Sequence, residues 1–140
     1  MRRARPRAAL PGLAVVAAIV AGCGGGHTVK LGTAERDCAS VVQAANAIQV
    51  VAGSDATASD IARSNAAAAA LTTAAANATT AVAGPAGQLA TTARAYAEAL
   101  GHHNIEGINT SGGKLRQQAA PIADVCKTTV LGVAPPGPTN

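Results

Sequence analysis

The sequence predicts an all-α protein, a small up-down bundle of four helices with an alanine-rich core. Apolar residues recur at intervals of three and four in four separate stretches, which places them on one face of an α-helix. The alternating apolar and polar runs typical of strands do not occur. Aromatic residues, which favour strands, are almost missing, with one Tyr, no Phe and no Trp. The abundant alanine has the highest intrinsic helix propensity of any residue.

The first helix is expected over residues 34–52. Thr33 is the expected N-cap, Glu35 and Asp37 suit the first turn, and Gly53 is the expected stop. The apolar face of this helix is predicted to consist of Cys38, Val41, Ala45 and Ile48.

The second helix is expected from residue 59 or 60 to residue 83, before Gly84 and Pro85. Ser54, Thr57 and Ser59 are competing N-caps. Its predicted apolar face consists of Ile61, Ala68, Leu71, Ala75, Ala78 and Val82.

The third helix is expected over residues 85–100, with Pro85 in the first turn and Gly101 as the C-cap. Its predicted face consists of Leu89, Ala93, Tyr96 and Leu100. A polar connection over residues 102–113 follows, with room for a short helix that carries Ile105 and Ile108.

The fourth helix is expected from residue 111 or 113 to residue 127. Pro121 lies inside it and predicts a kink or a split into two pieces. Its predicted face consists of Leu115, Ala119, Ile122 and Cys126. A three-helix arrangement remains the alternative, if the second or the fourth helix breaks. Residues 132–140, rich in Pro and Gly, predict a disordered tail without core residues.

The first 22 residues have the three zones of an export signal in the right order. Four arginines form a basic start, at Arg2, Arg3, Arg5 and Arg7. An uncharged apolar stretch follows over residues 8–22. It is shorter than the ~20 apolar residues that a membrane-spanning helix needs. We therefore expect residues 1–22 to be a cleaved signal peptide.

The signal ends in Val20-Ala21-Gly22-Cys23, which resembles the lipobox of bacterial lipoproteins. That resemblance implies cleavage before Cys23, a lipid on Cys23, and attachment to the outer face of the cell membrane. An ordinary cleaved signal that contains a cysteine is the alternative. Residues 23–32 then form the lipidated cysteine and a glycine-rich flexible tether, and residues 33–131 the helical domain. The chain as a whole resembles the small alanine-rich lipoproteins of actinobacteria, whose function is not known.

Two cysteines, Cys38 and Cys126, remain once Cys23 is acylated. Outside the cytoplasm the compartment is oxidising, so they predict one disulfide rather than two free buried thiols. An up-down bundle supports this pairing, because it brings the start of the first helix and the end of the fourth to the same side. Such a staple suits a small alanine core, which buries little apolar area.

The charge pattern excludes a nucleic-acid partner. After the signal is removed, seven basic and seven acidic residues remain, scattered singly. A basic stripe of the kind that binds nucleic acid is therefore missing. Neither a catalytic motif nor a metal-ligand set is recognisable, since the chain has only three histidines, His27, His102 and His103, and no cysteine or carboxylate completes a zinc set with them. We predict no enzymatic activity, no metal and no cofactor.

Two observations leave a ligand-carrying function open. Tyr96 and His103 lie seven residues apart and share a face if the third helix continues through Gly101, and both residue types ligate haem iron. In addition, residues 37–39 and 121–126 resemble the ends of small exported helical haem carriers of actinobacteria, although the chain between them lacks that family's aromatic and proline landmarks. The preferred prediction is an envelope protein-interaction or structural module anchored at Cys23. The alternative is a carrier of a small apolar ligand such as haem or lipid.

Overall fold

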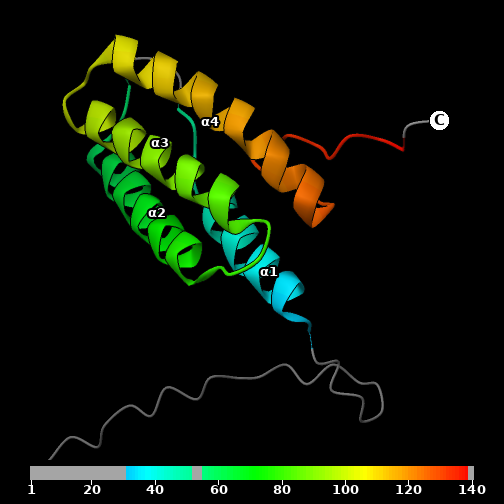
Figure 1. Cartoon of the computed structure of the whole chain (residues 1–140). Coiled ribbons are helices and arrows are strands. Elements are labelled where there is room, and N and C mark those ends of the chain that lie inside the picture. Colours follow the sequence, from blue (N-terminus) through cyan, green and yellow to red (C-terminus); the bar gives the residue numbers. More distant parts are fainter. Residues whose placement is uncertain (1–30, 52–54, 139–140) are drawn as a thin grey trace, which may run out of the picture.

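The computed structural model describes residues 31–51 and 55–138, and these form a bundle of four helices (Figure 1). The helices are α1 (Thr33–Asn46), α2 (Ala58–Asn77), α3 (Ala83–Gly101) and α4 (Ile105–Cys126). Consecutive helices run in opposite directions, so the up-down order is clear in Figure 1. The predicted all-α class and four-helix bundle are confirmed, and the three-helix alternative is wrong.

Helix α3 is the central element of the bundle. It packs along α2 on one side and along α4 on the other. Helix α1 lies against α2 and α4 and touches α3 over a smaller area. It is therefore the most peripheral of the four helices.

The core consists of alanines with a few larger side chains. Ala45, Ala86 and Ala119 are completely buried, which allows the helices to approach closely. The largest fully buried side chains come from all four helices and two loops: Tyr96, Leu71, Leu89, Leu100, Ile108, Leu115, Ile122, Val41, Val82 and Val130.

Helix α1 differs from its prediction at both ends. Thr33 is the first helical residue and Gly32 occupies the N-cap, with its N–H donated to the Glu35 carboxylate at 2.8 Å. At the other end α1 stops at Asn46 instead of residue 52. Residues 48–50 are not helical, and the Val51 N–H is donated to the Tyr96 hydroxyl at 2.8 Å instead of to a carbonyl one helical turn earlier.

Helix α2 has Thr57 as its N-cap, one of the three predicted candidates. The Thr57 hydroxyl accepts the Asp60 N–H at 3.2 Å, and the Asp60 carboxylate accepts the Thr57 N–H at 2.9 Å. Ser59 lies inside the helix, and Ser54 lies outside the described residues. The helix ends at Asn77, six residues before the prediction, because the N–H groups that follow are bound by α1, as described below.

Val82 was expected on the face of the second helix, but it is the N-cap of α3 and is fully buried. Helix α3 begins at Ala83 and holds Pro85 in its first turn, as predicted. It includes Gly101 as its last residue, so the predicted C-cap is wrong by one position. His103 then adopts the left-handed conformation, with φ of 52°, which reverses the chain.

Helix α4 is one continuous helix, and the predicted long connection over residues 102–113 is wrong. Asn104 caps it by accepting the Gly107 N–H at 3.0 Å, so the connection from α3 is only residues 102–104. The glycines lower helix propensity, yet Ile108 and Gly112 are buried in the bundle and packing overrides propensity. The predicted split at Pro121 does not occur, since α4 continues to Cys126. Pro121 lies on the exposed side of the helix.

A short turn follows α4 and folds back onto the bundle. Val130 and Val133 exchange two backbone hydrogen bonds of 2.9 and 2.8 Å. Asn46, the last residue of α1, accepts the Leu131 N–H at 2.8 Å. Val130 is fully buried and Val133 packs against the core, although Val133 lies in the segment predicted as a tail. The structure describes that segment as far as residue 138.

Candidate functional site

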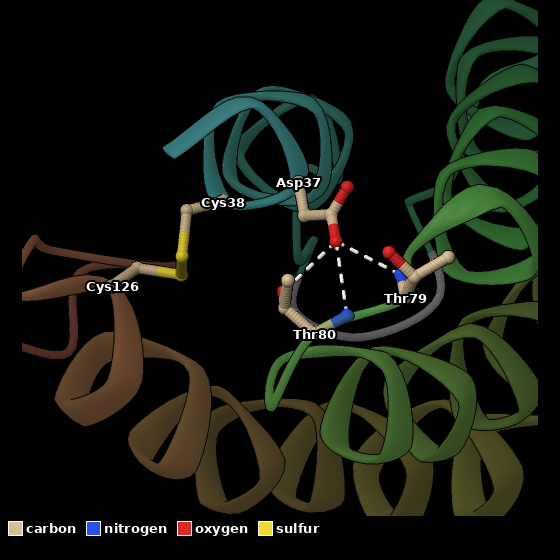
Figure 2. Close-up of a disulfide and its surroundings, with 5 residues drawn as sticks. All are labelled: Asp37, Cys38, Thr79, Thr80 and Cys126. Atoms are coloured by element: carbon tan, nitrogen blue, oxygen red, sulfur yellow. Dashed lines mark hydrogen bonds between the residues drawn. A yellow bond between two sulfur atoms is a disulfide. The ribbon is translucent and has the colours of Figure 1, made fainter. Parts of the chain in front are cut away.

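Cys38 and Cys126 form a disulfide that joins α1 to α4, with their Cα atoms 5.5 Å apart (Figure 2). Cys38 lies in the second turn of α1, and Cys126 is the last residue of α4. The predicted pairing is confirmed. The antiparallel order of the helices explains it, because the start of α1 and the end of α4 lie at the same end of the bundle.

Asp37, beside the disulfide, fastens α1 to the turn between α2 and α3. One of its carboxylate oxygens accepts the Thr79 N–H at 2.9 Å, the Thr80 N–H at 3.1 Å and the Thr80 hydroxyl at 2.8 Å. Figure 2 shows Asp37 directed at this turn and Cys38 directed at α4. Two adjacent residues of α1 thus hold two different parts of the bundle.

The hydrogen bonds lower the pKa of Asp37 from its ordinary value. The Thr79 N–H contributes most and the Thr80 hydroxyl next, because both stabilise the charged carboxylate. The sequence placed Asp37 in a first helical turn, where it also suits the helix dipole. Nothing in the pattern pointed to a bond with residues more than forty positions away.

A surface groove runs between α1 and the end of α4, over the disulfide. It has a volume of about 540 Å³ and is lined largely by apolar groups, including Ala34, Ala39, Val42, Val125 and the two bridged cysteines. Val125 is 41% exposed at its edge. Sequence reasoning missed this groove, because it arises from the distance between two helices rather than from a motif.

A second groove of about 530 Å³ lies on the opposite side of α1, between α1 and α2. Ser40, Gln43 and Ala44 line it from α1, and Ala70, Thr73 and Ala74 line it from α2. Helix α1 therefore has open space along both flanks. Its attachment depends on the disulfide and on a few polar contacts as well as on its buried face.

Tyr96 is fully buried and its hydroxyl is used inside the fold. It accepts the Val51 N–H and lies 3.4 Å from the carbonyl oxygens of Gln49 and Val51, to either of which it donates. Burial raises the pKa of Tyr96, while the Val51 N–H opposes that rise and the negative charge of Asp60 adds to it. Tyr96 thus anchors residues 49–51 to α3.

The structure does not bring Tyr96 and His103 together on one helix face. Helix α3 ends at Gly101, and His103 is exposed in the left-handed turn beyond it. The continuation that would align the two residues is therefore not present. Within residues 31–51 and 55–138, no three His, Cys, Asp or Glu side chains gather as a metal ion would require.

Cys23, the signal over residues 1–22, the glycines at 24–26 and His27 lie outside the described residues. None of the four helices is long and apolar enough to cross a membrane. The disulfide itself is typical of proteins in oxidising compartments.

Comparisons with protein-family models, with curated proteins and with solved structures found no match.

Proposed function

We propose that this chain is the precursor of a bacterial lipoprotein. Residues 1–22 direct export, Cys23 carries the lipid, and residues 23–32 connect the lipid to the helical domain. The domain lies on the extracytoplasmic face of the cell membrane and acts there as a non-enzymatic module that contacts another envelope protein.

The observation that carries the proposal is the disulfide between Cys38 and Cys126. Thiols of cytosolic proteins are kept reduced, whereas exported proteins form stable disulfides. The pairing uses two of the three cysteines in the chain and leaves Cys23, which stands directly after two small residues at the end of the apolar stretch. The disulfide and the lipobox are separate features of the chain, and both support a location outside the cytoplasm.

The surface of the domain supports a binding function rather than a catalytic one. The groove between α1 and α4 offers an apolar strip beside exposed Val125, which suits contact with a protein surface. Among the described residues, no group of three His, Cys, Asp or Glu side chains is placed to hold a metal ion.

Metabolic labelling with an alkyne fatty acid tests the anchor. We expect label on the wild-type protein and on the control Gly25→Ser, which keeps the lipobox intact. We expect none on Cys23→Ser, since the thioether needs the Cys23 sulfur. An unlabelled wild-type chain, or label retained on Cys23→Ser, would contradict the proposal.

Photo-crosslinking in intact cells tests the partner. A photoreactive residue at Ala39, in the groove, is expected to give a protein adduct of one discrete mass. The same residue at Asn65, exposed on α2 away from both grooves, is the control. Failure to detect any groove-specific adduct under several growth conditions would count against a protein partner.

The second candidate is a carrier of a small apolar ligand such as haem or lipid, and the volume of the groove favours it. Sites for small molecules measure roughly 300–1,000 Å³, and this groove measures about 540 Å³. Such a ligand would contact Val42 and Val125 rather than buried Tyr96. Native mass spectrometry of protein extracted from its host tests this candidate. An added ligand mass that Ala39→Trp abolishes would favour it over the protein partner.

A further inference from the structure

We propose that the Cys38–Cys126 disulfide is an exchange site for a protein dithiol, and that its reduction releases α1 from the other three helices. The proposal goes beyond the function above, because it assigns the disulfide a role in changing the conformation of the domain.

The disulfide is accessible from the surface. Both cysteines are only half-buried, and both line the open groove between α1 and α4. The residues on either side of Cys126 are exposed, with Val125 at 41%. A disulfide at the bottom of a surface groove can be reached by an attacking thiolate, whereas one enclosed in a core requires unfolding first.

Helix α1 is the element that the disulfide restrains. Open grooves flank it on both sides, and its contact with central α3 is small. Its other polar links are few: Asp37 with the turn after α2, Asn46 with the turn after α4, and the segment after α1 with Tyr96. None of these links is part of the packing of α3 on α2 and on α4, which are the two most extensive helix contacts in the bundle.

The exchange proceeds in two balanced steps. A thiolate of the partner dithiol attacks one sulfur, so the Cys38–Cys126 bond breaks, a mixed disulfide forms, and the released cysteine takes a proton. The second partner thiolate then attacks the mixed disulfide and releases the other cysteine. Two electrons pass to this protein, which ends with two thiols, while the partner ends with a disulfide.

Release of α1 also changes how far the domain reaches from the membrane, a consequence that rests on the proposed anchor at Cys23. With the disulfide closed, the connection from Cys23 to the bundle ends at Thr33, the start of α1. With α1 released, it ends at Ala58, the start of α2. Each additional residue adds up to about 3.3–3.6 Å of reach.

Reduction kinetics combined with hydrogen exchange test the proposal on the full chain carrying Cys23→Ser, in which Cys38 and Cys126 are the only cysteines. The probe is a thioredoxin-type dithiol, and alkylation of new thiols is followed by mass. Ala39→Trp fills the groove over the disulfide, and Ala70→Trp, in the groove between α1 and α2, is the matched control. Because this variant carries no lipid, failure of the anchor proposal does not affect the result.

We expect the probe to reduce the folded protein, with Ala39→Trp slower by on the order of tenfold and Ala70→Trp unchanged. After reduction, amides of α1 should exchange rapidly while those of α2, α3 and α4 stay protected. Reduction that occurs only at the rate of global unfolding would overturn the proposal. So would equal rates for the two variants, or an α1 that stays protected once both cysteines are thiols.

Discussion

At the scale of single residues, three polar side chains link the α1 region to distant parts of the bundle. Asp37 binds the turn after α2, Asn46 binds the turn after α4, and Tyr96 binds the segment that follows α1. Each makes a short hydrogen bond to a backbone N–H that would otherwise lack a partner inside the protein. Removing such an acceptor costs more than the bond itself contributes.

Replacing Asp37 by Asn should lower the urea midpoint of unfolding at neutral pH, because the amide keeps an acceptor oxygen but loses the charge. The folded state lowers the pKa of Asp37. Its contribution to the free energy of unfolding is therefore present above the unfolded pKa of about 3.9 and is lost as pH falls through the lowered folded pKa. The difference between variant and wild type should accordingly shrink in acid.

The control for this prediction is Asp124→Asn, whose carboxylate contacts only exposed Lys127 on the surface. We expect little change in its midpoint at any pH. An Asp37→Asn protein as stable as the wild type at neutral pH would show that the contact with the turn is unimportant.

Replacing Tyr96 by Phe should reduce the free energy of unfolding by about 1–3 kcal/mol, because the Val51 N–H loses its acceptor in a part-buried position. Urea unfolding followed by far-UV circular dichroism measures this. Thr91→Val removes a hydroxyl from the exposed side of the same helix and should change stability by less than about 0.5 kcal/mol. Equal effects of the two substitutions would refute the role given to Tyr96.

At the scale of helices, the sequence predicted faces better than ends. All four residues expected on the face of the third helix are buried, and so are Leu115, Ala119 and Ile122 on the fourth. The ends of α1 and α2 were placed too late. The chain beyond each helix is held by a distant side chain: Tyr96 binds Val51 after α1, and Asp37 binds Thr79 after α2. Periodicity reports which side of a helix is buried but carries no information about such distant acceptors.

Two adjacent glycines of α4, Gly112 and Gly113, allow the effect of helix propensity to be distinguished from the effect of side-chain packing. A methyl group at Gly113 would meet nothing within 4 Å, so Gly113→Ala should raise the free energy of unfolding by about 0.5–1 kcal/mol. A methyl group at Gly112 would lie 3.2 Å from the Val50 side chain, so Gly112→Ala should gain less or destabilise. Thermal unfolding of both variants measures the difference. If Gly112→Ala stabilised as much as Gly113→Ala, the Val50 side chain would not lie close to Gly112.

At the scale of the whole molecule, the disulfide closes almost the entire described chain, with a sequence separation of 88. In the chain-entropy model, closing a loop of that length lowers the entropy of the unfolded chain, which raises the free energy of unfolding by about 4–5 kcal/mol. The double substitution Cys38→Ser with Cys126→Ser should therefore lower the free energy of unfolding by up to about 4–5 kcal/mol, and the stability that remains is that of α2, α3 and α4. Urea unfolding of the reduced wild type, which should match the double variant, is the control; a loss below about 1 kcal/mol would contradict this account.

The candidate site was predictable only in part. The pairing of Cys38 with Cys126 followed from the compartment and from the up-down order of the helices. The groove over it did not, since its volume depends on how closely α1 approaches α4. The alignment of Tyr96 with His103 depended on a helix that ends at Gly101, where the left-handed turn at His103 begins.

The lipid anchor at Cys23 is tested most directly by the intact mass of the protein extracted from the membranes of its own host. We predict a chain that begins at Cys23, carries the added mass of acyl chains on that residue, and lacks the two hydrogens of the Cys38 and Cys126 thiols. A chain without acyl mass, recovered from the growth medium, would contradict the lipid anchor.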